Sequence, residues 1–149
     1  MEALHQPDEE IIEQIDSICD PFRTPERFVV FLARWVDLER IFAPHHESAG
    51  PEESPISTGL GRLRELTRTA ATLARWRGTR RGLILFLETA TGIPGFNIDD
   101  RVVTAEGALT PFHIRVTAPK AAEPHRPLLE RIIEVERPAY VTWELVFKE

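Results

Sequence analysis

The chain has 149 residues, of which 42% are hydrophobic and 28% are charged. This length suits one ordinary domain and the composition is typical of globular proteins, so two large domains and wholesale disorder are excluded. The single cysteine, Cys19, excludes an intrachain disulfide.

The net charge of −6 is unevenly distributed along the chain. Residues 1–57 carry thirteen Asp or Glu and four Arg, a charge of −9, whereas residues 58–82 carry seven Arg and one Glu, a charge of +6. Two interpretations stay open. Either the acidic N-terminal part packs against the Arg-rich segment, or that segment is a docking face for an acidic partner chain.

Residues 8–18 predict a short amphipathic helix in an acidic N-terminal segment, residues 1–22. Ile11, Ile15 and Ile18 recur at helical spacing behind an acidic first turn. A helix this short is stable in water only when it is packed. These isoleucines therefore need a groove, in this chain or in a neighbour.

The sequence Thr24-Pro25-Glu26 predicts the start of a helix that runs to about Phe42, with Thr24 as its cap. Apolar residues, Trp35 among them, extend over most of its girth, so we expect it to be buried on several sides. Residues 43–58 predict a loop. Its His45-His46 pair lacks a second pair of ligands, which favours a solvated loop over a zinc site.

A narrow apolar face and several arginines predict a basic helix over residues 58–77, joined within a few residues to a helix over 79–91. Gly78 is suited to the left-handed conformation that closes the first helix, Thr79 to capping the second, and Gly92 to ending it. We define the joint as the residues that link the two helices, namely Arg77, Gly78, Thr79, Arg80, Arg81, Gly82 and Leu83.

Arg80 and Arg81 lie in the first turn of the second helix, where the helix macrodipole disfavours cations. We therefore expect at least one of them to be tied to a carboxylate or to helix-end carbonyls, within the chain or across a subunit boundary. An anion site is the other interpretation of the joint. No catalytic group is nearby, which favours the structural interpretation.

The last third of the chain predicts two strands, a helix and a strand. Alternation indicates strands at 98–104 and 111–117, the latter through Phe112, with a turn at Gly107. A helix over 127–136, ended by Pro138, precedes a strand over 139–147. This crossover places the strand that precedes the helix in the sequence and the strand that follows it next to each other in the sheet, and parallel. The fold class is therefore α+β: a helical hub, residues 23–95, followed by a small strand–helix–strand module, residues 96–149.

The chain contains no phosphate loop, nucleophile elbow, zinc-protease motif or paired cysteines. We therefore expect no enzymatic activity, cofactor or metal. The N-terminus lacks the features of a signal peptide and no apolar run approaches a membrane span, so we expect the chain to stay in the cytoplasm unless it leaves inside a larger particle. A small nucleic-acid-binding regulator using the Arg-rich helix, residues 62–81, is the alternative, although the negative charge opposes approach to phosphate.

Three segments carry a resemblance to a known family: Thr24 to Val36, the joint continuing to Thr91-Gly92, and Glu136-Arg137-Pro138-Ala139-Tyr140. They resemble the phage tail protein I family, baseplate wedge subunits of contractile tails and contractile injection systems. The resemblance spans about residues 20–147, and the joint is its most specific part.

This resemblance implies a structural role in a phage tail or tail-like particle. It implies that the chain packs with two copies of a larger baseplate J-like subunit, as a helical bundle that branches into a small hub, and that several such wedges ring the central spike. It implies no small-molecule substrate and no membrane.

Overall fold

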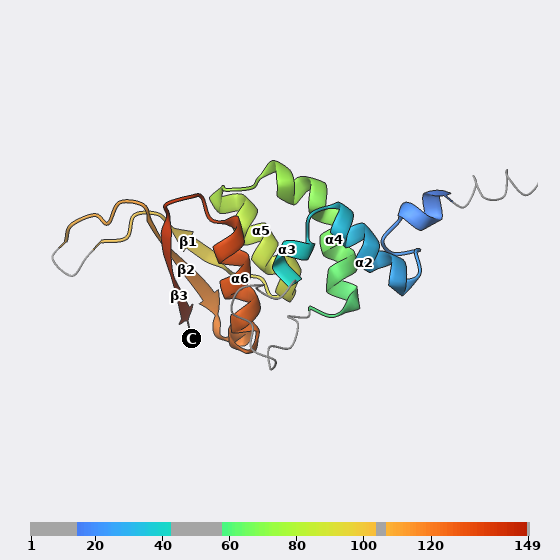
Figure 1. Cartoon of the computed structure of the whole chain (residues 1–149). Coiled ribbons are helices and arrows are strands. Elements are labelled where there is room, and N and C mark those ends of the chain that lie inside the picture. The colour runs from blue at the N-terminus through green and yellow to red at the C-terminus, as the bar shows by residue number, and fades with distance from the viewer. Residues whose placement is uncertain (1–14, 43–57, 104–106, 149) are drawn as a thin grey trace, which may run out of the picture.

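The computed structural model describes residues 15–42, 58–103 and 107–148, and it shows an α+β chain. Its helices come first and its strands gather near the C-terminus (Figure 1). Residues 15–19 are helical. The elements that follow are α2 (Glu26–Trp35), α3 (Glu39–Phe42), α4 (Leu60–Arg75), α5 (Arg80–Thr91), β1 (Asn97–Asp99), β2 (His113–Pro119), η2 (Lys120–His125), α6 (Arg126–Glu136) and β3 (Thr142–Lys148).

The three strands form one sheet in the order β1-β2-β3. Strand β1 runs antiparallel to β2, and β2 runs parallel to β3, with His113 opposite Thr142 and Pro119 opposite Lys148. The connection from β2 to β3 passes through η2 and α6. The predicted strand–helix–strand crossover with parallel strands is therefore confirmed.

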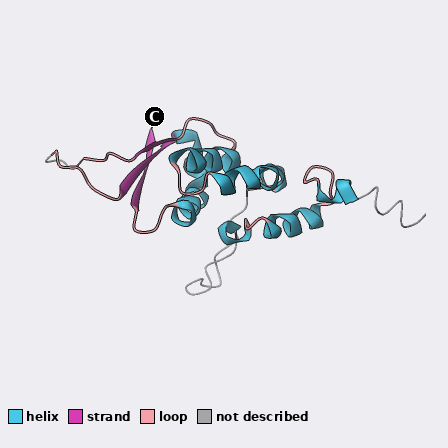
Figure 2. Cartoon of the chain, turned by 90° about the horizontal axis from the view of Figure 1, so that it is seen from above, coloured by secondary structure: helices cyan, strands magenta, loops and turns pink. Residues whose placement is uncertain are grey.

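Helices pack on one side of the sheet, as the view from above shows (Figure 2). Helix α5 contacts α4, α6 and β1, and so lies at the centre of the packing. One hydrophobic core contains side chains from the helices and from the sheet. Its fully buried members include Ile41, Leu66, Leu87, Val116, Leu129, Ile132 and Ile133. None of the helices in the described ranges combines the length and apolar character that spanning a bilayer requires.

The predicted continuous helix over residues 24–42 is wrong. It divides into α2 and α3 at Asp37, whose φ of 62° lies in the left-handed region, a conformation that Asp tolerates better than most residues. The Leu38 N–H donates to the Ala33 carbonyl at 3.0 Å and closes α2. This reversal brings α3 back so that Ile41 enters the core.

The predicted cap is also wrong. Helix α2 begins at Glu26 after Pro25, whose carbonyl accepts from the Phe28 N–H at 2.9 Å. The Thr24 hydroxyl is buried without a hydrogen-bond partner among the described residues, so it caps nothing there.

The first predicted strand is shorter than expected, and Phe112 lies outside the second. Strand β1 contains three residues, and a single bridge between Val103 and Leu109 extends the hairpin beyond it. Phe112 has a φ of 55° and its side chain is 74% exposed. It lies just before β2 begins, and only its carbonyl joins the ladder, by accepting from the Thr142 N–H.

Candidate functional site: the helix joint and an exposed apolar surface

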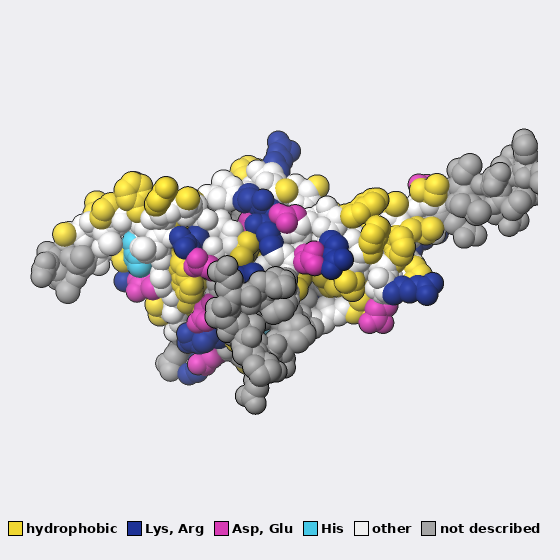
Figure 3. Space-filling model, in the orientation of Figure 1, with side chains coloured by type: hydrophobic (Ala, Val, Ile, Leu, Met, Phe, Trp, Pro, Cys, Tyr) yellow, Lys and Arg dark blue, Asp and Glu magenta, His cyan; other side chains and the backbone are white. Residues whose placement is uncertain are grey.

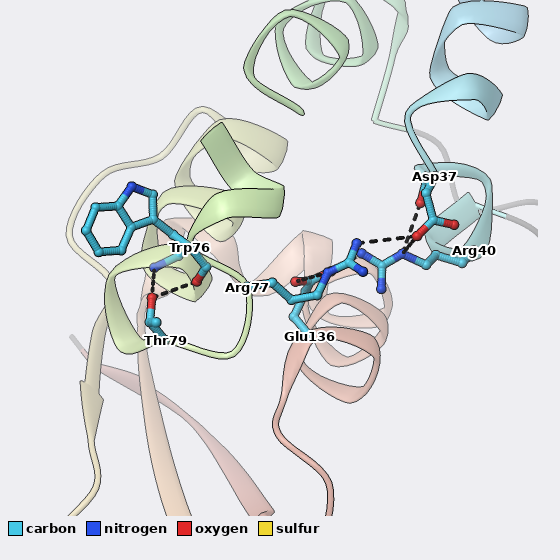
Figure 4. Close-up of polar contacts among 7 residues, drawn as sticks. Asp37, Arg40, Trp76, Arg77, Thr79 and Glu136 are labelled. Atoms are coloured by element: carbon cyan, nitrogen blue, oxygen red, sulfur yellow. Dashed lines mark hydrogen bonds and ion pairs between the residues drawn. The ribbon is translucent and has the colours of Figure 1, made fainter. Parts of the chain in front are cut away.

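The joint between α4 and α5 is closed by the contacts that the sequence predicts. Gly78 has a φ of 71°, in the left-handed region. The Thr79 hydroxyl accepts from the Gly82 N–H at 3.1 Å and donates to the Trp76 carbonyl at 2.6 Å (Figure 4). Gly92, with a φ of 72°, ends α5 and donates its N–H to the Glu88 carbonyl at 2.7 Å. The predictions for Gly78, Thr79 and Gly92 are confirmed.

Gly82 has a role in the joint that the sequence did not reveal. A Cβ atom at this position would lie 2.0 Å from the carbonyl oxygen of Trp76 and 2.7 Å from its carbonyl carbon. Main-chain atoms cannot move aside as a flexible side-chain end can. The first turn of α5 therefore packs directly on the last residue before the joint, and only glycine fits.

Arg80 and Arg81 find neutral partners within the described part of the chain. The Arg80 guanidinium donates to the side-chain oxygen of Asn97 in β1 at 2.7 Å. The Arg81 guanidinium lies 4.6 Å from the centroid of the Trp76 ring, a cation–π contact. The carboxylate or carbonyl partner that we predicted is therefore absent within the described residues. That one of these arginines pairs with a carboxylate or a carbonyl of another subunit stays a prediction.

Arg77 belongs to a cluster of four charged side chains (Figure 4). Its guanidinium lies 3.3 Å from Asp37 Oδ2 and 3.7 Å from Glu136 Oε2. Arg40 also pairs with both carboxylates: its Nε lies 3.1 Å from Asp37 Oδ2, and it contacts Glu136 Oε1 more closely. The cluster ties the end of α4, the α2–α3 turn and the end of α6 together.

Glu136 is the member of this cluster that the sequence analysis missed. Its side chain is only 5% exposed, and a carboxylate that leaves water needs paired cations. It is the last residue of α6, where the helix macrodipole disfavours an acid. An acid at the end of a helix could have indicated a charged partner in the sequence, just as the cations Arg80 and Arg81 at the start of α5 did.

The cluster also brings together two of the segments on which the family resemblance rests. Pro138 lies beside Gly78, with its Cγ 4.0 Å from where a Cβ of residue 78 would be. A cleft of about 230 Å³ opens between the joint, the sheet and the α6–β3 turn. Its lining includes Gly78, Thr79, Arg80, Leu83, Glu136 and Pro138.

A second set of contacts ties the last turn of α6 to β3. The Trp143 Nε1–H donates to Glu134 Oε2 at 2.9 Å, and the Arg137 guanidinium donates to both oxygens of Glu134. The hydrogen bond from Arg137, followed by that from Trp143, holds the pKa of Glu134 below its ordinary value.

The Arg-rich helix α4 is held largely by contacts inside the chain. Arg64 donates to the Thr24 carbonyl at 3.0 Å and to the Pro21 carbonyl, and Arg68 pairs with Glu65. The hydrogen bond from Arg68 lowers the pKa of Glu65. The N-terminal part thus packs near this helix, mostly through carbonyl groups. The acids at 8–14 lie outside the described residues, as do Ile11 and the His45-His46 loop.

Helix α2 carries a continuous apolar surface that is open to solvent (Figure 3). Only Val29, Leu32 and Ala33 of this helix are buried. Its exposed side bears Trp35, 72% exposed, and Phe31, 43% exposed. We define the α2 apolar surface as the exposed side chains of Ile15, Ile18, Phe22, Val30, Phe31, Trp35 and Val36. As far as the described residues show, the expectation that this helix is buried on several sides is wrong.

The aromatic side chains of Phe31 and Trp35 form a row with that of the partly buried Phe28. The ring centroids of Phe28 and Phe31 are 5.1 Å apart, as are those of Phe31 and Trp35, with tilted planes. Such aromatic pairs stabilise each other and fix their orientation. The row is therefore an ordered apolar surface.

The described residues hold no group of three or more His, Cys, Asp or Glu side chains that could bind a metal ion. His113 is partly buried and contacts the Thr142 hydroxyl at 2.8 Å. No family model matches this sequence, and comparison with curated proteins gives no match. The interpretation of the site thus depends on its own geometry and on the resemblance described above.

Proposed function

We propose that this protein is a non-enzymatic baseplate wedge subunit of a contractile tail or injection particle. In this role it packs with two copies of a J-like subunit around the central spike. The protein is made in the bacterial cytoplasm and becomes part of the particle there.

The α2 apolar surface is the observation that carries this proposal. An exposed apolar surface of this kind on a folded chain marks an interaction site. It includes Ile15 and Ile18 of the residue 15–19 helix, part of the predicted 8–18 helix that we assign to an intersubunit bundle, and Trp35 of α2, which belongs to the predicted hub. A helix from a partner would cover the aromatic row through its own apolar stripe.

The contacts of the Arg-rich helix weigh against the nucleic-acid alternative. Of the arginines that such a regulator would use, Arg64 is engaged with main-chain carbonyls, Arg68 with Glu65, and Arg77 with Asp37 and Glu136. Arginines engaged in this way are less available to phosphate. Duplex binding with a steep salt dependence would revive that alternative.

The test is co-purification of this chain with the J-like subunit encoded beside it. We expect a stable complex with the wild-type chain and its loss in the double variant Phe31→Ser, Trp35→Ser. The matched control is Leu109→Ser, Phe112→Ser, because those side chains are at least as exposed as Phe31 and Trp35, respectively, but lie on the β1–β2 hairpin. The proposal would be overturned by the absence of sheath, tube and spike reading frames nearby. It would also be overturned if the Phe31→Ser, Trp35→Ser variant formed the complex as well as the wild-type chain does.

A further inference from the structure

Strand β3 forms an open edge of the sheet. Within the described residues it pairs with β2 alone, over its whole length from Thr142 to Lys148. Natural proteins usually protect such edges with proline, bulges or central charges. The sequence of β3, Thr-Trp-Glu-Leu-Val-Phe-Lys, contains no proline, and its charged side chains flank an apolar centre.

The direction of the unpaired main-chain groups follows from one hydrogen bond. The Thr142 N–H donates to the Phe112 carbonyl at 2.8 Å, so Thr142 faces β2. Main-chain groups of successive strand residues point to opposite sides. Trp143, Leu145 and Phe147 therefore direct three N–H and three C=O groups toward the open edge.

We propose that β3 pairs with β3 of a second copy of this chain, antiparallel and about a twofold axis at Leu145. In this register Trp143 lies opposite Phe147 of the second copy, and Leu145 lies opposite its own equivalent. These are the residues whose main-chain groups point outward. All three positions become hydrogen-bonded pairs, and the full length of the strand is used.

The side chains of β3 are complementary to themselves in this register. On the face toward α6, Trp143, Leu145 and Phe147 are only partly buried in one chain, and the pairing places the Trp143 ring beside Phe147 of the second copy. On the other face, Glu144 lies opposite Val146 and diagonal to Lys148 of the second copy. No like charges lie directly opposite each other, and aromatic and opposite-charge neighbours stabilise strand pairs. The two Glu144 side chains are diagonal to each other, and each is paired with Arg115 of its own chain.

This pairing goes beyond the proposed function and does not depend on it. The α2 apolar surface belongs to a different part of the molecule from β3 (Figure 1). Self-association measured on the purified chain tests the β3 pairing alone, whereas binding of the J-like subunit tests the wedge proposal. Failure of one leaves the other standing.

The first test compares two charges at one exposed position by sedimentation equilibrium. Val146 is 43% exposed, so both substitutions are compatible with the monomer. Val146→Glu places like charges opposite Glu144 twice in the dimer, and we expect roughly tenfold weaker dimerisation. Val146→Lys places opposite charges there and should retain or strengthen the dimer. A wild-type chain that stays monomeric, or a dimer that responds equally to both variants, overturns the proposal.

The second test is a crosslink that reads the register. In a Cys19→Ser background, chains with Glu144→Cys are mixed with chains with Val146→Cys under mild oxidation. The register predicts a disulfide between the two kinds of chain and little within either kind, because position 144 faces position 146. Equal crosslinking in all three samples, or none in the mixture, overturns the register and with it the proposal.

Discussion

Glu136 Oε2 lies 3.7 Å from Arg77 Nε, so the last residue of α6 and the segment after α4 share a charged contact. Arg40 approaches the other oxygen of Glu136 more closely. Since the Glu136 side chain is almost fully buried, these two arginines replace the water that it lost on folding. The joint is therefore held from three directions: by its own turn, by α3 and by α6.

The two arginines should differ in their contribution to stability. Arg40→Met removes the closer partner and leaves Glu136 buried beside a more distant charge, and we expect a loss of about 2–3 kcal/mol. Arg77→Met removes the longer and more exposed contact and should cost about 1 kcal/mol. Urea unfolding at neutral pH measures both values. Equal losses would show that Glu136 does not depend on Arg40 in particular.

Gly82→Ala should be among the most damaging single substitutions in the chain. The added methyl group would lie 2.0 Å from the Trp76 carbonyl oxygen, so α5 must shift away from the joint. We expect a loss of about 2–4 kcal/mol by thermal or urea unfolding. Gly61→Ala is the matched control, because Gly61 lies in α4 with nothing within 4 Å of its Cβ position. That control should gain about 0.5–1 kcal/mol, and similar losses in both variants would contradict the close approach at Gly82.

The parts of the fold that the sequence predicted are those that local chemistry determines. Gly78 and Thr79 form the joint through contacts a few residues apart, so their spacing was sufficient evidence. The parallel pairing of β2 and β3 followed from the strand–helix–strand order. The break at Asp37 was missed because nothing in its neighbours prevents the helix from continuing.

The features that escaped prediction depend on distant parts of the chain. The burial of Glu136 requires Arg40 and Arg77, which come from other elements. Periodicity showed which sides of α2 are apolar. It could not show that no element of the described ranges covers Phe31 and Trp35, because that depends on the arrangement of all the other helices.

Acid should weaken the contact between α6 and β3 through Glu134. Hydrogen bonds from Arg137 and Trp143 lower the pKa of Glu134 from its ordinary 4.5 in the folded chain. The stabilisation is therefore complete above the unfolded pKa and is lost as the pH falls below 4.5 through the folded value. The effect is small, because the side chain is 45% exposed and water screens the pair.

Glu134→Gln should flatten the dependence of the unfolding free energy on pH in this acidic range. Trp143→Phe removes only the indole donor and should flatten it less. Urea unfolding at a series of pH values, followed by far-UV circular dichroism, measures the slope for each chain. An unchanged slope in Glu134→Gln would show that this carboxyl group is not linked to folding.

Trp35→Ala should separate interaction from stability, because Trp35 is 72% exposed in the isolated chain. Its loss removes the stacking on Phe31 and little buried area, so we expect a cost of about 0.5–1 kcal/mol. Leu32→Ala is the comparison within the same helix. Leu32 is only 7% exposed, and its truncation should cost about 2–4 kcal/mol. Calorimetric unfolding of the purified chains measures both.

Leu32→Ala should cause the larger loss of stability, whereas Trp35→Ala should cause the larger loss of partner binding. A Trp at the centre of an apolar interface typically contributes at least about 2 kcal/mol, so Trp35→Ala should weaken capture of the J-like subunit by about thirtyfold or more. Leu32→Ala, assayed below its melting temperature, should bind almost normally because its side chain faces the core. If Trp35→Ala instead destabilises the free chain as much as Leu32→Ala, then α2 packs against its own chain and its apolar surface is not kept for a partner.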